Sequence, residues 1–215
     1  MKIKALLFDM DGLMVDTERL YYETERQMAE EFETTVETST LWKMMGKKPI
    51  ESMTIFQQDL DLPISPEELL TKRDELMVIK MNEDLIPMKG LYEILQTFFK
   101  KVRMGVVTGA REDFLDIVIY KLNIRHYFDL LLTSEEITHG KPDPEIYLNA
   151  IAKLNLLPTE CVVLEDSSNG AKAGKDAGCY TIAIPSEYTM EQDFSFVDFI
   201  ATDLIEAREH LLELM

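Results

Sequence analysis

Four carboxylates follow two apolar runs of the chain, and their types and spacing could support chemistry. Asp9 and Asp11 come directly after one run, and Glu165 and Asp166 follow another. Clustered carboxylates repel one another unless a cation lies between them. A hard divalent cation with few protein ligands and retained water is typically magnesium rather than calcium. Taken alone, Asp9-Met10-Asp11-Gly12 could equally form a simple turn after a strand.

Groups that could hold an anion follow the other apolar runs. Thr108 and Gly109 offer a hydroxyl and an open backbone N–H near the start of an expected helix, which suits an oxyanion. Lys141, between Gly140 and Pro142, could place its ammonium beside a phosphate. The alternatives are an ordinary helix cap at Thr108 and a solvated surface lysine at position 141. With Arg111, these residues form the candidate substrate-binding set of this part of the chain.

The elements that must position these side chains alternate between apolar runs and helical patterns. The expected strands are Ile3–Phe8, Val102–Val107, Leu130–Thr133, Cys161–Leu164 and Cys179–Ile184. The expected helices are Leu91–Lys100, Glu112–Leu122, Pro144–Leu154, Asn169–Ala177 and an amphipathic, solvated segment over Asp203–Glu213. This alternation predicts an α/β fold with a doubly wound parallel sheet. Ligands of such sheets bind beyond the carboxyl ends of the strands, where all the candidate residues above would gather.

Residues 16–82 interrupt the alternation and predict a small inserted domain of helices. The expected helices are Glu18–Phe32, Ser39–Met45, Pro49–Leu60 and Glu67–Met81. We therefore expect a core domain built from residues 1–15 and 83–215 and a helical cap domain over 16–82. Lys47 and Lys48 are the candidate substrate-binding residues of this cap.

Composition and charge limit the partners. The 215 residues carry a formal net charge of −18, which should repel nucleic acid and anionic membranes. A phosphate-bearing ligand must therefore be small and must meet a local basic pocket or a metal ion. The two cysteines, Cys161 and Cys179, are expected as buried free thiols, with one disulfide as the alternative. Without a signal-peptide pattern or a membrane-length apolar run, we expect a cytoplasmic monomer that binds neither nucleic acid nor membranes.

Taken together, the four loops resemble the haloacid dehalogenase superfamily. Its Asp-x-Asp-Gly motif matches Asp9–Gly12, and its second-motif Ser/Thr matches Thr108. Its third-motif lysine in a Gly-Lys-Pro-x-Pro setting matches Lys141, and its acidic pair matches Glu165-Asp166. The helical insert resembles the small cap of this superfamily, so the likeness covers nearly the whole chain.

The resemblance implies a role for each motif residue. Asp9 would be the nucleophile that forms an aspartyl-phosphate, and Asp11 would act as general acid and then general base. Magnesium would be bound by the Asp9 carboxylate, the Asp11 backbone carbonyl and Asp166, with Glu165 supporting the site through water. Thr108 and Lys141 would hold the phosphoryl oxygens. Because the dehalogenase branch lacks the second aspartate, Asp11 favours phosphoryl transfer.

Two groups within the superfamily are similar to this chain. Pseudouridine-5'-phosphatases resemble it at Asp16–Tyr21, Met45–Lys48 and His139–Pro144. β-Phosphoglucomutases share the core and cap, but they have a histidine where Tyr21 stands and an arginine in the cap loop that holds Lys47, Lys48 and Pro49 here. We therefore expect a magnesium-dependent phosphatase of small phosphomonoesters, either sugar phosphates or nucleoside monophosphates. The alternatives are phosphoryl transfer of the β-phosphoglucomutase type and a non-catalytic phosphate-binding relative.

Overall fold

The computed structural model describes residues 2–44 and 48–215, and these residues form two compact units. One unit combines residues 1–16 with 86–215, and the other spans 17–85. The first unit is built around a six-stranded parallel sheet in the order β3-β2-β1-β4-β5-β6. In chain order the strands are β1 (Ala5–Phe8), β2 (Arg103–Val107), β3 (Leu130–Leu132), β4 (Cys161–Glu165), β5 (Tyr180–Ala183) and β6 (Phe199–Ile200).

The order of the strands reverses at β1. From β1 the chain builds β2 and β3 on one side, and then it returns to place β4 on the other side. Leu7 of β1 is therefore paired with Gly105 of β2 and with Val163 of β4. In parallel sheets, ligands bind where the strand order reverses in this way. The carboxyl ends of β1 and β4 thus mark the position at which functional side chains are expected.

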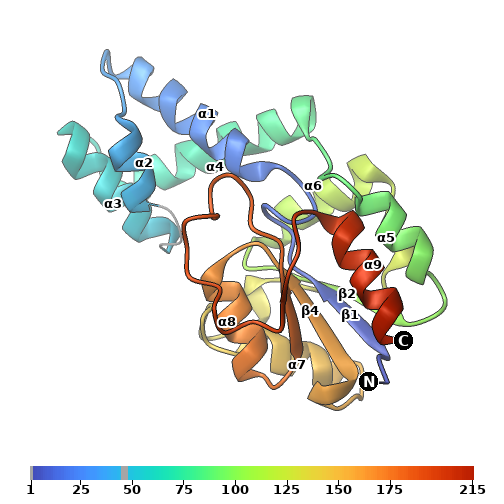
Figure 1. Cartoon of the computed structure of the whole chain (residues 1–215). Helices are drawn as coiled ribbons and strands as arrows, with labels where there is room; N and C mark the ends of the chain where they lie inside the picture. Colours follow the sequence, from blue (N-terminus) through green and yellow to red (C-terminus); the bar gives the residue numbers. More distant parts are fainter. Residues whose placement is uncertain (1, 45–47) are drawn as a thin grey trace. The chain divides into compact units, whose positions relative to one another are not determined.

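Helices cover both faces of this sheet, as Figure 1 shows for α7 and α8 against α5 and α9. They are α5 (Leu91–Phe98), α6 (Glu112–Leu122), α7 (Glu145–Lys153), α8 (Ser168–Asp176) and α9 (Leu204–Leu214), with short 3-10 turns at Arg125–Tyr127, Ser134–Glu136 and Pro158–Glu160. Leu7 packs in one core cluster with Ile146 and Tyr147 of α7 and Ala173 of α8. The expected α/β class with a doubly wound parallel sheet is confirmed.

Helix α8 lies very close to the sheet, as its content of small residues predicts. A Cβ added at Gly174 would come within 2.8 Å of Val163 Cγ1 and 3.0 Å of Thr181 Oγ1. Any larger residue would have to push the helix away from β4 and β5. Close packing therefore fixes the start of α8, and with it the two acidic residues that end and follow β4.

In its described part, residues 17–44 and 48–85, the second unit contains four helices around a core of its own. They are α1 (Thr17–Glu31), α2 (Thr38–Met44), α3 (Pro49–Leu60) and α4 (Pro66–Asp84). Met28, Met53, Phe56 and Leu69 are buried together in this core. Helix α4 begins with a capping box, in which Ser65 and Glu68 exchange hydrogen bonds between side chains and backbone.

Two further expectations can be compared with the structure directly. Cys161 and Cys179 are buried free thiols, and burial raises the pKa of Cys161 to about 11. The segment after Asp203 forms α9, in which Asp203 caps the helix and Leu204, Ala207 and Leu211 are buried. Among the described residues, no helix combines the length and apolar character needed to cross a bilayer.

Candidate active site

A single lysine joins the ends of β1, β2 and β4. The Lys141 ammonium donates to Asp9 Oδ1 at 2.5 Å, to Glu165 Oε1 at 2.6 Å and to the Val107 carbonyl at 3.2 Å. The Lys141 side chain is only 12% exposed, and those of Asp9 and Glu165 are 9% and 1% exposed. The alternative of a solvated surface lysine at position 141 is therefore wrong.

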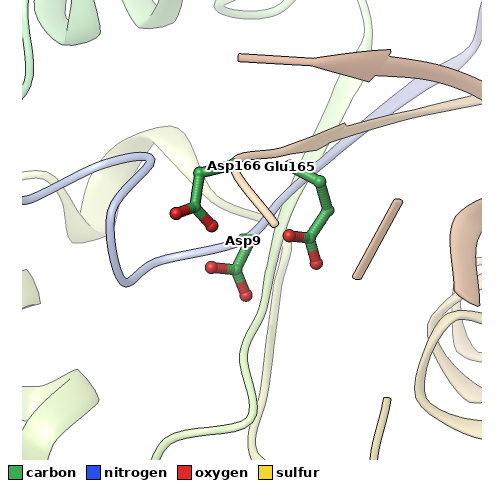
Figure 2. A group of neighbouring side chains, drawn as sticks. All are labelled: Asp9, Glu165 and Asp166. Atoms are coloured by element: carbon green, nitrogen blue, oxygen red, sulfur yellow. The ribbon is translucent and has the colours of Figure 1, made fainter. Parts of the chain in front are cut away.

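The acidic residues meet at the same place. One carboxylate oxygen from each of Asp9, Glu165 and Asp166 lies within 4.8 Å of the other two, and all three residues are buried. Figure 2 shows Asp9, at the end of β1, facing the two acidic residues at the end of β4. Three carboxylates beside one ammonium leave an excess of negative charge, which a divalent cation with oxygen ligands would neutralise. The donor set therefore fits the expected metal ion, although it does not distinguish magnesium from other hard cations.

Burial and charge shift the pKa values of this cluster strongly. Burial raises the pKa of Asp9 well above its ordinary value, and Glu165 and Asp11 raise it further while Lys141 lowers it. Burial alone would lower the pKa of the Lys141 ammonium, but Asp9 and Glu165 outweigh that effect and raise it. The lysine therefore stays charged, and its charge favours the ionised form of Asp9 that a nucleophile requires.

Two hydroxyl groups hold the Glu165 carboxylate in addition to Lys141. The Tyr147 hydroxyl donates to Glu165 Oε1 at 2.7 Å, and the Ser167 hydroxyl donates to Oε2 at 3.3 Å. The Lys141 ammonium also lies over the Tyr147 ring, 5.1 Å from its centroid. A Cβ added at Gly170 would lie 1.9 Å from Glu165 Oε1, so this position of α8 has room only for glycine. Glu165 is thus fixed from several directions.

The residues that follow β1 and β4 also fix Asp166. Gly12 has a φ of +72° and closes a turn in which its N–H donates to the Val15 carbonyl at 2.9 Å. A Cβ at Gly12 would come within 2.3 Å of Asp166 Oδ2, so the turn and the carboxylate lie against each other. On the other side, the buried Thr189 hydroxyl donates to the Asp166 carbonyl at 2.8 Å. Asp11 lies in this turn, close enough to act on the pKa of Asp9.

The backbone of the site continues the hydrogen-bond ladder of the sheet. Asp9 N donates to the Leu164 carbonyl at 3.0 Å, and Thr108 N donates to the Leu132 carbonyl at 3.0 Å. Thr108 is fully buried, and its hydroxyl accepts from Ala110 N at 3.0 Å. Its alternative as a helix cap is wrong, because the N-cap of α6 is Arg111.

The remaining candidates lie in different settings. Around Gly109 the space is open, with no atom within 4 Å of an added Cβ. Arg111 is half exposed and forms an ion pair with Asp113 at 2.6 Å. Lys48 is the exposed N-cap residue of α3 in the second unit, and Lys47 lies outside the described residues. Substrate binding by these residues stays a prediction.

Comparison with known proteins decides the family. The model of haloacid dehalogenase-like hydrolases matches residues 6–184. The chain belongs to this family. This haloacid dehalogenase-like hydrolase is 32% identical over 177 residues to a phosphorylated carbohydrates phosphatase of Thermotoga maritima, covering 82% of each chain. It is 26% identical to a fructose-1-phosphate phosphatase of Escherichia coli, covering 81% of this chain and 92% of the relative.

Solved structures of the family share its fold. A candidate β-phosphoglucomutase from Thermotoga maritima has a TM-score of 0.84 at 27% identity. The match covers 99% of this chain and 100% of the mutase chain. CbbY from Rhodobacter sphaeroides, in complex with phosphate, also has a TM-score of 0.84 at 23% identity, covering 95% and 96% of the two chains. At that identity the second likeness concerns the fold alone.

Sequence reasoning on this hydrolase missed the residues that support the acidic cluster. In the sequence, Tyr147 has the pattern of an ordinary apolar position of an amphipathic helix. The hydrogen bond from its buried hydroxyl to Glu165 is known only from the structure. Thr189 lies 23 residues from Asp166, in a segment without regular structure. No local signal identifies such a contact, because the path of the long loop between β5 and β6 determines it.

Proposed function

We propose that this haloacid dehalogenase-like hydrolase is a magnesium-dependent phosphatase that hydrolyses small phosphomonoesters through an aspartyl-phosphate at Asp9. The observation that carries the proposal is the Lys141 ammonium, which joins Asp9 and Glu165 within a buried cluster of three carboxylates. Such a cluster places a nucleophile, a fixed positive charge and a set of metal ligands within one small space.

The chain's residues divide the reaction into two displacements. The Asp9 carboxylate attacks phosphorus and forms an acyl phosphate while the bond to the ester oxygen breaks, and Asp11 gives its proton to that oxygen. Asp11 then takes a proton from the attacking water, which releases inorganic phosphate and restores the Asp9 carboxylate. Lys141 and Thr108 bind the phosphoryl oxygens throughout. Asp9, Asp166 and the Asp11 carbonyl, supported by Glu165, would hold a magnesium ion, whose charge would neutralise that of the phosphate.

Sugar phosphates are the first substrate class that we propose. Two relatives bear names that refer to phosphorylated carbohydrates and to fructose-1-phosphate, and the chain spans most of both. Nucleoside monophosphates are the second class. We propose that residues 16–82 act as a cap whose residues, Lys47 and Lys48 among them, select the leaving group.

The structural likeness to a candidate β-phosphoglucomutase makes phosphoryl transfer between sugars the second candidate function. The chain departs from mutases at Tyr21, where a histidine would relay protons. The Arg73 guanidinium lies over the Tyr21 ring, 5.2 Å from its centroid, so this ring has a packing role in the helical unit. A tyrosine is uncharged near neutral pH and does not replace a histidine as a proton relay. We therefore favour hydrolysis over transfer.

The test uses para-nitrophenyl phosphate in the presence of magnesium. We expect turnover that exhaustive chelation removes, magnesium restores and calcium inhibits. Asp9→Asn should lower turnover by roughly 10³-fold or more, because an amide is not a nucleophile here. Asp116→Asn, which changes an exposed aspartate of α6, is the matched control and should retain activity. Near-normal turnover of Asp9→Asn, or full activity after chelation, would refute the mechanism.

A second experiment distinguishes the two candidate functions. The enzyme is incubated with β-glucose-1-phosphate and a bisphosphate primer, and a panel of sugar phosphates and nucleoside monophosphates is run alongside. We expect inorganic phosphate to be released faster than glucose-6-phosphate forms. The opposite order would establish the mutase instead.

A further inference from the structure

A basic cavity lies at the end of the sheet that faces away from the acidic cluster. Its volume is about 670 Å³, and five cationic side chains line it: Lys2, Lys4, Lys100, Lys101 and Arg103. Cavities of this size are typical of small-molecule sites. In a chain with a formal net charge of −18, five of the 22 lysines and arginines therefore surround one small volume.

The parallel sheet explains why these residues meet. Lys2 and Lys4 precede β1, Lys100 and Lys101 precede β2, and His126–Asp129 precede β3. The three strands are neighbours, so their amino ends lie at one edge. The backbone ties this edge together, since Arg103 N donates to the Lys4 carbonyl at 2.9 Å. Asp9 follows the opposite end of β1, so a ligand in this cavity does not occupy the phosphatase site.

The charges of the cavity are only partly neutralised by the protein. Lys4 forms an ion pair with Glu160 at 2.5 Å, and the Arg103 guanidinium donates to the Leu154 carbonyl at 2.5 Å. Asp129, the carboxylate in the lining, accepts a hydrogen bond from Met104 N at 3.0 Å. Within residues 2–44 and 48–215, the exposed Lys2, Lys100 and Lys101 form no ion pair. Three ammonium groups are thus available to an anionic ligand.

An aromatic wall lies beside these amines. The Phe99 ring meets the rings of His126 and Tyr127 edge-on, with centroid distances of 5.9 Å and 5.1 Å. The centroids of the His126 and Tyr127 rings are 4.1 Å apart. The Lys100 ammonium lies over the Phe99 ring, 5.1 Å from its centroid, and this contact holds the amine at the cavity. Flat rings beside several cations suit a ligand that carries phosphate groups and, in nucleotides, a base.

Lys100 occupies a backbone position that lysine does not favour. Its φ is +61°, and it follows Phe99, the C-cap residue of α5, at a position where glycine or asparagine usually ends a helix. Left-handed conformations are unfavourable for a residue with a Cβ. This turn places the Lys100 amine on the wall of the cavity.

We propose that this cavity binds a small ligand that contains a polyphosphate chain. Several ammonium groups around a volume of about 670 Å³ match the charge and size of a chain of phosphates better than those of a single phosphate. The shared chemistry is that of inorganic polyphosphate and of nucleoside triphosphates. A large polyanion such as nucleic acid is disfavoured, because the remainder of the chain is strongly negative.

The experiment is titration calorimetry of the whole chain at low salt with excess chelator, which prevents turnover. Tripolyphosphate and ATP are the two probes. One variant is Lys100→Gly, which suits the left-handed backbone and removes the amine together with the rest of the side chain. The other is the double variant Lys2→Gln with Lys101→Gln. Lys172→Gln is the matched control, because it removes a half-exposed lysine from α8, outside the cavity.

We expect one bound ligand per chain, an affinity loss of about tenfold or more in both cavity variants, and an unchanged affinity in Lys172→Gln. Hydrolysis of para-nitrophenyl phosphate should be unchanged in every variant. Tighter binding of ATP than of tripolyphosphate would show that the aromatic wall binds the base of a nucleotide. Equal affinities would show that the site recognises only the phosphate groups. The absence of saturable binding, or equal affinities in the variants and the control, would overturn the proposal.

Discussion

The Tyr147 hydroxyl donates to Glu165 Oε1 at 2.7 Å, and the same oxygen receives the Lys141 ammonium at 2.6 Å. Tyr147 and Glu165 are both fully buried. Tyr147 therefore acts as a positioning residue, which restrains Glu165 and, through Glu165, the amine that contacts Asp9. Burial and the neighbouring Glu165 and Asp9 raise the pKa of Tyr147 well above its ordinary value, so the hydroxyl keeps its proton.

Tyr147→Phe should weaken both stability and turnover. Loss of a buried hydrogen bond to a carboxylate should lower the free energy of unfolding by about 1–2 kcal/mol, measured by urea denaturation. The value of kcat should fall several-fold with KM little changed, and activation should require more magnesium. Tyr120→Phe is the control, because the Tyr120 side chain is 85% exposed. If the two variants behave alike, Tyr147 has no positioning role.

Gly170→Ala should inactivate the enzyme without touching a reacting group. The new methyl would lie within 1.9–2.2 Å of the Glu165 carboxyl atoms, so Glu165 must move. A displacement of about 1 Å in a catalytic site lowers the rate by roughly 10²-fold. Gly140→Ala is the matched control, since no atom lies within 4 Å of its added methyl. Steady-state turnover of both variants is the measurement, and comparable activities would contradict the role given to Glu165.

Asp11→Asn should separate the two chemical steps. An activated aryl phosphate has a good leaving group and needs no acid, so Asp9 should still become phosphorylated. The later attack of water should slow by roughly 10²- to 10⁴-fold, because the general base is lost. A burst of product followed by slow turnover in stopped flow would support this role. Unchanged steady-state turnover of an alkyl phosphate would count against it.

Glu25 should make stability depend on pH. This residue of α1 is 6% exposed, and burial raises its pKa from 4.5 to about 8, with Arg73 lowering it and Glu18 raising it. Between pH 4.5 and 8, Glu25 holds a proton in the folded chain that it has lost in the unfolded chain. The stability that this difference contributes is therefore full below pH 4.5 and disappears as pH rises through 8. The slope is at most about 1.4 kcal/mol per pH unit.

Glu25→Gln carries a permanently neutral side chain and should remove this part of the pH dependence. Urea denaturation from pH 5.5 to 8.5 measures it, and the variant should gain stability relative to wild type as pH rises. Glu30→Gln changes an exposed glutamate of the same helix and serves as the control. Parallel stability curves for Glu25→Gln and wild type would show that Glu25 is ionised in the folded chain.

The fold could be predicted because each strand of the core is a continuous apolar run bounded by polar or small residues. Residues 5–8 and 161–165 form strands within one or two residues of the expected bounds. Strand β6 was not predicted, because Phe199–Ile200 is too short to form a pattern. Helix α4 continues to Asp84, beyond the expected end at Met81, because no proline or glycine interrupts it before Pro87.

The candidate site could be predicted only in part. Asp9, Lys141, Glu165 and Asp166 were identified because each immediately follows a strand or lies in a loop with a distinctive local sequence. The contacts that hold them come from positions without such a signal. Gly170 reads as a helical residue, and the need for glycine appears only once Glu165 is placed against it.

The ladder of the sheet does not stop at the last strand residue, since Asp9 N still donates to the Leu164 carbonyl. The backbone of Asp9, the proposed nucleophile, is therefore ordered when the chain folds, before any substrate arrives. Fixing one residue's backbone costs roughly 1–2 kcal/mol of conformational entropy, and here that loss belongs to folding rather than to the activation step. Asp9 should accordingly exchange its amide hydrogen only when the central strands separate, which makes it a marker of global opening.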